Sequence, residues 1–150
     1  MAEQWQLRKG STAENEGFVG AEGELTYDTT TKAVHVHDGE TAGGALIDAV
    51  VAYQLPTSAN NYTWYRLYAS GWVEQGGKGQ VTTNGLGNTF TLPITMSNTN
   101  YTITAVKWAG DTGNVGFQAE PSTTTQFKAG VAYSSALTRN FTWEVKGMAA

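Results

Sequence analysis

Apolar and polar residues alternate in short runs along most of this chain, as they do in β-strands, where successive side chains point to opposite faces. The densest such stretch is residues 64–77, WYRLYASGWVEQGG, in which two aromatic-rich runs flank Ala-Ser-Gly. A glycine-containing break of three residues is typical of a β-hairpin loop. We therefore predict two strands joined at residues 69–71. Their structural aromatic residues are Trp64, Tyr65, Tyr68 and Trp72.

The aromatic residues of this hairpin occupy both of its faces, because Trp64 and Tyr68 alternate with Tyr65. Buried aromatic side chains dominate the energetics of cores and interfaces. One face is therefore expected to fill a core, and the other to pack on a neighbouring sheet or subunit. Stacking of these rings on a ligand is the alternative.

Runs of the same kind recur at regular spacing from residue 61 onward, and turn signals such as Asn84-Gly85 and 111–114 separate them. This spacing is typical of a β-sandwich. We predict an antiparallel β-sandwich over residues 61–150. Its expected strands are 63–68, 72–76, 79–83, 88–92, 100–108, 114–120, 125–132 and 140–146.

The first part of the chain, residues 1–44, has a second alternating pattern on either side of the polar turn 28–32, which predicts another hairpin. A segment of about 40 residues buries too little apolar surface to be stable alone, so we expect it to intertwine with copies of itself. Residues 45–60 form a linker. Within it Leu46, Val50 and Tyr53 are spaced as in a helix, whereas the valines also suit a strand, and the choice stays open.

Composition supports an all-β fold, since the chain has 18 glycines and only 15% charged residues. It has no cysteine, which excludes disulfides and thiolate metal sites. The net charge of −4, with no clustered basic residues, makes nucleic acid an unexpected partner. The longest apolar stretch, 45–53, is interrupted by Asp48, so membrane insertion is not expected either. The first residues lack the apolar core of a signal peptide, which indicates synthesis in a cytoplasm.

His35 and His37 are the weak candidates for a metal site, because they share one face of a predicted strand and a trimer would bring six imidazoles together. Histidines on strands are common without metal, so we expect no metal and no cofactor. We also expect no enzyme, since catalysis needs a base, a nucleophile or paired carboxylates. The acids of the second part are far apart in sequence and belong to no such motif: Glu74, Asp111, Glu120 and Glu144.

Residues 7–47, LRKGSTAENEGFVGAEGELTYDTTTKAVHVHDGETAGGALI, resemble the N-terminal segment of many phage and prophage tail-fibre proteins, the major tropism determinant family. The resemblance implies a trimeric β-rich base that docks residues 1–44 on virion tail or baseplate proteins. It also implies a place in the virion, in a tail fibre or tail tip. The matching positions, which we take as structural, are Arg8, Gly10, Thr12, Ala13, Glu14, Gly23, Glu24, Asp28, Val36, His37, Asp38, Gly39, Thr41, Gly43 and Gly44.

The second part is similar to the receptor-binding knobs of phage fibres that have an H-type-lectin-like sandwich. The similarity rests on the 64–77 hairpin, TFTLPITMSNTNYTITAVK and the closing FTWEVKG. Where such knobs often end in Trp-x-Ala/Cys-x-Gly, this chain has Trp143-Glu-Val-Lys-Gly147. The resemblance implies a homotrimeric fibre that binds a host-surface glycan or protein. A purely structural virion component is the alternative.

The direction in which the chain runs through successive strands predicts which loops lie at the receptor-binding end. If the strands reverse at every connection, the turns at 69–71, 84–87, 109–113 and 133–139 share one end, which carries recognition residues of the usual types. If Gly76-Gly77 lies within one continuous strand, 93–99 and 121–124 become the distal loops instead. Ordinary turn formation also accounts for the residues chosen. The candidate receptor-binding residues are Asp111, Thr112, Asn114, Tyr133, Ser134, Ser135, Arg139 and Asn140.

Overall fold

The computed structural model describes residues 6–82, 85–108, 116–132 and 138–150. Nearly all of its regular structure is β, and the larger part is an antiparallel sandwich, so the predicted fold class is confirmed. The chain forms two compact units. The first contains the described residues up to Val51 together with Tyr68–Ser70, and the second contains Ala52–Leu67 and the described residues from Gly71 onward. The proposed functional division at residues 44 and 60 stays a prediction.

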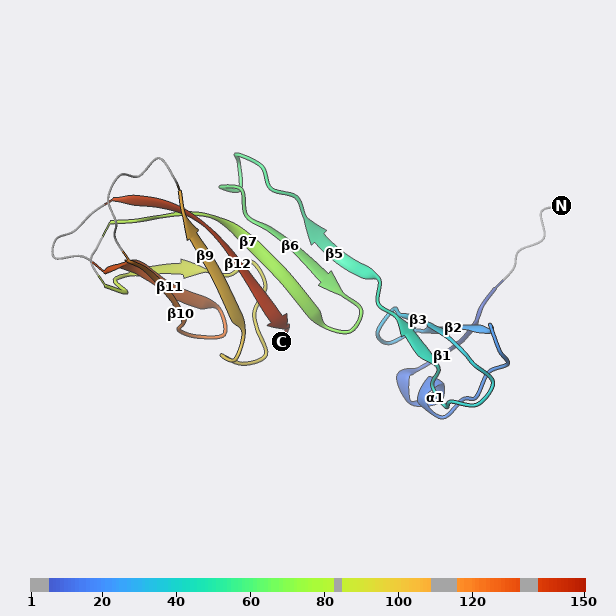
Figure 1. The fold of residues 1–150 in the computed structure, drawn as a ribbon. Helices are drawn as coiled ribbons and strands as arrows, with labels where there is room; N and C mark the ends of the chain where they lie inside the picture. The colour runs from blue at the N-terminus through green and yellow to red at the C-terminus, as the bar shows by residue number, and fades with distance from the viewer. Residues whose placement is uncertain (1–5, 83–84, 109–115, 133–137) are drawn as a thin grey trace. The chain divides into compact units, whose positions relative to one another are not determined.

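The first unit is a four-stranded sheet with one short helix (Figure 1). The strand order is β1-β2-β3-β4, in which β1 is parallel to β2 and the other neighbours are antiparallel. The pairing of β2 with β3 confirms the hairpin predicted around residues 28–32. The elements are β1 (Arg8–Gly10), α1 (Thr12–Glu16), β2 (Leu25–Asp28), β3 (Val34–Val36) and β4 (Ala45–Ile47).

The alternation of apolar residues does not predict α1, which begins after a capping box. The Ser11 hydroxyl accepts from the Glu14 N–H, and the Glu14 carboxylate accepts from the Ser11 N–H at 2.7 Å. These bonds satisfy amides that the first helical turn leaves without partners. The hydrogen bonds with Ser11 also lower the pKa of Glu14. The Ser-x-x-Glu spacing is the sequence signal for this helix.

The interior of the first unit is largely polar, with Asn15, Thr26, Asp28 and His37 all buried. Burial raises the pKa of Asp28, but bonds from the Thr12 hydroxyl (2.7 Å) and from the amides of residues 30–31 outweigh it and lower the pKa from 3.8 to about 2. A bonded polar interior specifies geometry while burying little apolar surface.

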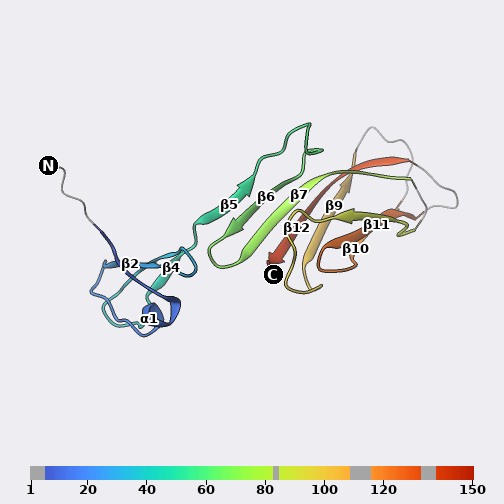
Figure 2. The same ribbon diagram turned by 180° about the vertical axis from the view of Figure 1, so that it is seen from behind.

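The second unit is a sandwich of a five-stranded sheet, β5-β6-β7-β12-β9, and a three-stranded sheet, β10-β11-β8; only the first two residues of β5 and the last residue of β6 are counted with the first unit. Figures 1 and 2 show β10 and β11 beside the larger sheet. The open choice between helix and strand at residues 46–53 is settled, because β4 and β5 occupy them. The strands are β5 (Val50–Gln54), β6 (Trp64–Tyr68), β7 (Trp72–Val81), β8 (Asn88–Thr91), β9 (Thr102–Lys107), β10 (Gly116–Pro121), β11 (Gln126–Ala132) and β12 (Arg139–Met148).

The aromatic hairpin predicted at 64–77 is confirmed as β6 and β7. Its loop is Ala69-Ser70-Gly71, and Gly71 has a positive φ of 83°, as such loops require. The inward side chain Leu67 packs against the sandwich core. The fully or nearly buried core residues are Val73, Val81, Leu92, Met96, Tyr101, Phe127, Ala129, Val131, Phe141, Trp143 and Val145.

The prediction of separate strands at 72–76 and 79–83 is wrong, since β7 runs unbroken from Trp72 to Val81 in regular register with β12. Gly76 and Gly77 do not make a turn. They make room for tryptophan rings: a Cβ on Gly76 would lie 2.7 Å from Trp64 Nε1, and one on Gly77 would lie 3.1 Å from the Trp143 ring.

Continuity of β7 changes which loops share an end, so the prediction that 69–71 lies with 84–87, 109–113 and 133–139 is wrong. Register places 69–71 at the opposite end of the sheet, where the Ala149 N–H donates to the Gly71 carbonyl. The strand ends that flank 84–87, 109–113 and 133–139 do lie together, because Arg139 pairs with Val81 and Phe141 with Lys107.

The additional strand β5 reverses the chain once more before β6. The Ala69 N–H donates to the Ala49 carbonyl at 2.9 Å, so β5 begins beside the 69–71 turn. The strand ends that flank the three predicted loops therefore lie at the opposite end of the sheet from the start of β5.

The alternative, in which 93–99 and 121–124 are distal, is also wrong. The Ser97 N–H donates to the Met148 carbonyl and the Tyr101 hydroxyl to the Thr123 carbonyl, which places both segments at the end where β5 begins.

Replacement of Asp28 by Asn should lower the stability of the first unit at neutral pH, because the amide cannot accept these bonds as strongly as the carboxylate. The folded-state pKa lies below the usual 3.8, so the carboxylate's stabilisation is present above about pH 4 and is lost as pH falls toward 2. Hydrogen exchange of residues 24–37 at several pH values measures this effect. A difference between wild type and variant that is independent of pH would contradict it.

Replacement of Gly79 by Ala should destabilise the second unit by about 1–3 kcal/mol, because overpacking a filled core displaces its side chains. The new methyl group would collide with the Phe141 ring and lie 2.9 Å from Phe90 Cε1. Gly116→Ala is the control, since its methyl group meets only Ala132 Cβ, at 3.4 Å. Urea denaturation of both variants measures the difference, and equal stability would show that the close packing at Gly79 is not needed.

Candidate functional site

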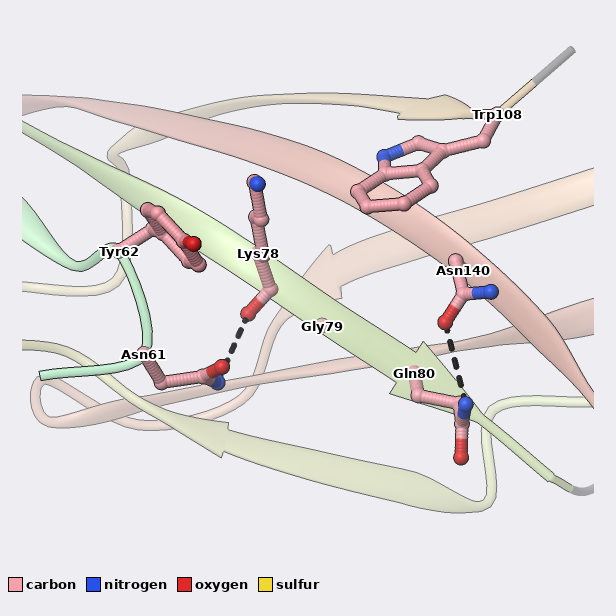
Figure 3. A pocket seen from close by; sticks show the side chains of 7 residues that line it. All are labelled: Asn61, Tyr62, Lys78, Gly79, Gln80, Trp108 and Asn140. Carbon is pink, nitrogen blue, oxygen red and sulfur yellow. Dashed lines mark hydrogen bonds between the residues drawn. The ribbon is translucent and has the colours of Figure 1, made fainter. Parts of the chain in front are cut away.

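A pocket of about 380 Å³ opens on the second unit, on the face of the five-stranded sheet opposite the core. Side chains of β7 alternate between the two faces, so Val81 points into the core while Lys78 and Gln80 point outward. Figure 3 shows the residues that line the pocket. They are Asn61, Tyr62, Lys78, Gly79, Gln80, Trp108 and Asn140.

Lys78 stands between two aromatic rings in this pocket (Figure 3). Its ammonium nitrogen lies 3.7 Å from the ring centre of Tyr62 and 5.3 Å from that of Trp108. Both distances are within the range of cation–π attraction. Tyr62 is 41% exposed and Trp108 is 40% exposed, so both rings also face solvent.

Amide side chains supply the polar groups of the pocket. Gln80 pairs with Asn140 across β7 and β12, and its Nε2 donates to Asn140 Oδ1 at 3.1 Å. On the other side, Asn61 Nδ2 donates to the Lys78 carbonyl oxygen at 3.4 Å. The amides are thus held against the sheet and not left to rotate freely.

The loop between β5 and β6 places Tyr62 in an uncommon backbone conformation, with φ of 58°, and the preceding Asn61 has φ of 54°. Positive φ is unusual for a bulky residue, and such strain persists only where its surroundings enforce it. Here Asn60 bonds to Thr57 and Leu55, and the Tyr62 N–H donates to the Thr57 carbonyl at 2.7 Å. The loop therefore fixes Tyr62 over the sheet before any ligand arrives.

Two lysines on the outer face of the sheet, Lys146 and Lys78, differ in whether they have carboxylate partners. Lys146 lies 3.3 Å from Glu144 and 3.4 Å from Glu74, and hydrogen bonding and attraction to these carboxylates raise its pKa. Within the described ranges, no carboxylate lies within ion-pair distance of Lys78. The pocket is therefore a local positive site bounded by aromatic rings.

The pocket has the composition of a binding site for a small polar ligand with an apolar face. Such sites combine aromatic walls with a few placed polar groups. The residues that line it include no histidine, cysteine or carboxylate that could serve as a catalytic base, nucleophile or metal ligand.

Of the sequence-predicted receptor residues, Asn140 lies in the pocket, and Arg139 lies half-buried beside it at the start of β12. These residues and the pocket are at the same end of the sheet as the strand ends flanking 109–113. The other candidates lie outside the described residues: Asp111, Thr112, Asn114, Tyr133, Ser134 and Ser135.

Both candidate metal-binding histidines are held by protein groups. His37 is buried, its Nδ1 accepts from the Gly20 N–H (3.2 Å), and its Nε2 lies 3.0 Å from the Thr26 hydroxyl. His35 Nδ1 lies 2.8 Å from the Gly43 carbonyl oxygen. Among the residues that the structure describes, no group of three or more His, Cys, Asp or Glu is placed to hold a metal ion.

Sequence reasoning missed Tyr62, Lys78 and Trp108. Alternation carries a signal for Trp108, since Thr102, Thr104 and Val106 point outward and the next residue in this series is Trp108. A signal for the Tyr62 loop is the Asn60-Asn61 pair, because asparagine tolerates positive φ. The sequence predicts strands at 72–76 and 79–83 and puts Lys78 in the turn between them, so it does not reveal that Lys78 points outward from one continuous strand.

No helix in the described part of the chain is long and apolar enough to cross a membrane.

Comparison with known proteins connects the first unit to phage proteins. Residues 6–41 match the major tropism determinant N-terminal domain. The tail fiber receptor-binding protein of Bordetella phage BPP-1 is 54% identical over 39 residues. This alignment covers 26% of the chain and 10% of the relative, so the chain spans a small part of that protein's length.

Two solved structures show weaker similarity. The major tropism determinant P3c variant is 33% identical over 41% of this chain and 19% of that one, with a TM-score of 0.28. An R2-type pyocin tail fiber is 18% identical over 66% of this chain and 39% of that one, with a TM-score of 0.41. These scores are too low to indicate a shared overall fold. The match at residues 6–41 confirms that the first unit resembles the N-terminal domain of the major tropism determinant, as its sequence predicts.

Proposed function

We propose that this chain is part of a phage tail fibre or tail tip and that its second unit binds a receptor on the host-cell surface. The observation that carries the proposal is the 54% identity, over 39 residues, to a tail fiber receptor-binding protein. A recognition unit commonly places its binding residues on a rigid scaffold. The outward pocket around Lys78, with its fixed loop, supplies such a surface.

The receptor that suits this pocket is a glycan, because exposed aromatic rings stack on sugar rings and side-chain amides bond to their hydroxyl groups. Of the predicted receptor residues that the structure describes, Arg139 and Asn140 belong to the same proposed surface. They lie at the end of the sheet where Trp108 contributes to the pocket.

The first unit is proposed to dock on virion tail or baseplate proteins through residues 1–44. Its support is the family match at residues 6–41 and the exposure of apolar side chains in the unit. No enzymatic step is part of this proposal.

A homotrimer is the proposed assembly, since symmetric association covers apolar surface that one chain exposes. The edge strand β5 and the residue after it expose Val50 and Val51 (45% each), Tyr53 (66%) and Leu55 (67%). An exposed apolar edge strand invites pairing with another chain. A trimer would also present three receptor sites, which raises attachment strength through effective concentration.

Sedimentation of the full chain should report three copies. Val51→Lys with Tyr53→Lys should shift the protein toward monomer, because buried lysines oppose association. Thr91→Lys, on an exposed position of β8 opposite Gln126, is the control and should remain trimeric. A stable wild-type monomer at micromolar concentration would contradict the trimer.

The receptor function is tested by adsorption of the labelled full chain to a panel of bacterial strains. We expect binding to some strains, and we expect Tyr62→Ala with Trp108→Ala to reduce it about tenfold or more, as loss of aromatic anchors does at binding sites. Circular dichroism checks that the variant is folded. Absence of wild-type adsorption to every strain would favour a purely structural virion component, and unchanged adsorption by the folded variant would move the site away from this pocket.

A further inference from the structure

We propose that the pocket selects an acidic sugar, one that carries a carboxylate on its ring, and that Lys78 is the group that binds this carboxylate. The inference deepens the proposed receptor function and rests on it. It depends on three features of the pocket: the placement of the cation, the two flanking rings and the paired amides.

The cation of Lys78 is the distinctive feature of the pocket. The ammonium of Lys146, on the same face of the sheet, is neutralised by two carboxylates at 3.3 and 3.4 Å. Lys78 has no such partner among the described side chains, and aromatic faces surround its ammonium instead. Cation–π attraction holds the ammonium in place without cancelling its charge.

Burial of this charge decides between neutral and acidic ligands. A sugar that fills the pocket removes water from Lys78, and an unpaired charge taken out of water is costly. A neutral sugar offers only hydroxyl groups in return. A carboxylate forms a charge-assisted hydrogen bond, which is about twice as strong as a neutral one. The pocket therefore favours a sugar acid over its neutral counterpart.

The rings place a stacked sugar beside this cation. Tyr62 and Trp108 are each about two-fifths exposed, so each side chain has surface open to a sugar ring, although Lys78 covers one face of Tyr62. The Lys78 ammonium is 3.7 Å from one ring centre and 5.3 Å from the other. A sugar on either ring would therefore have a ring substituent within reach of the ammonium.

The amides complete recognition of the hydroxyl groups. Gln80 uses one amide hydrogen for Asn140, which fixes its side-chain carbonyl oxygen as an acceptor at the pocket wall. Phosphate is a poorer fit than carboxylate, because phosphate sites usually gather several donors from arginines or backbone amides, and the residues lining this pocket include one cation and no arginine.

The test uses two matched ligand pairs, trigalacturonate with its methyl ester and a hyaluronan tetrasaccharide with its carboxyl-reduced form. Binding to the full chain is measured by saturation-transfer NMR and by Trp fluorescence. At least one acid should bind about tenfold more tightly than its neutral partner, and its affinity should fall as salt is raised. Lys78→Met should abolish the preference, and Lys78→Arg should retain most of it.

Lys128→Met is the control, because it removes the same charge from an exposed strand position in the other sheet. It should bind both acids as wild type does. Equal affinity for acid and neutral partner, no binding of either acid, or a preserved preference in Lys78→Met would overturn the inference. Host adsorption separates the failure of the acidic-sugar site from the failure of the receptor function. If the wild type adsorbs and folded Lys78→Met adsorbs equally well, only the acidic-sugar site is overturned. If the wild type does not adsorb, the receptor function itself is contradicted.

Discussion

The ten-residue antiparallel pairing of β7 with β12 is the constraint on which the second unit depends. The register sets Gly77 opposite Trp143 and Gly79 opposite Phe141, so the missing side chains of one strand make room for the rings of the other. A shift by one residue would turn every side chain of β7 to the wrong face. The same register places Gln80 beside Asn140 on the outer face.

The two faces of this strand pair have different tasks. The inner face fills the sandwich with apolar side chains, and the outer face presents Lys78 beside Tyr62. The β5–β6 loop adds Tyr62 in a strained conformation that its own hydrogen bonds maintain. Backbone strain of this kind is often found at binding sites. The proposed receptor pocket is thus built by a core on one side and a loop on the other.

Much of the fold is readable in the sequence, because alternation with a period of two reports which face of a strand is buried. It locates the 64–77 hairpin and most strands of the sandwich correctly. It fails at Gly76-Gly77, where glycine serves close packing of Trp64 and Trp143, a cause that only the paired strands reveal. Glycine in a strand signals either a bend or a close approach, and local sequence does not distinguish them.

The site is less predictable than the fold for a related reason. Residues 61, 78, 108 and 140 come from four separate places in the chain, and the sheet register and the β5–β6 loop bring them together. Asn140 was predicted from its residue type, which is common in recognition loops. Lys78 has no distinguishing local pattern. The Ser-x-x-Glu spacing at Ser11 and Glu14, by contrast, is a local signal for helix α1, although alternation with a period of two does not predict it.

The proposed receptor site lies on the outer face of the five-stranded sheet. A crystal structure of the full chain with bound trigalacturonate is the decisive test. We expect a sugar ring stacked on Tyr62 or Trp108, with its carboxylate at hydrogen-bond distance from Lys78 Nζ. A sugar bound elsewhere, or a pocket covered by a neighbouring chain of the same assembly, would contradict it.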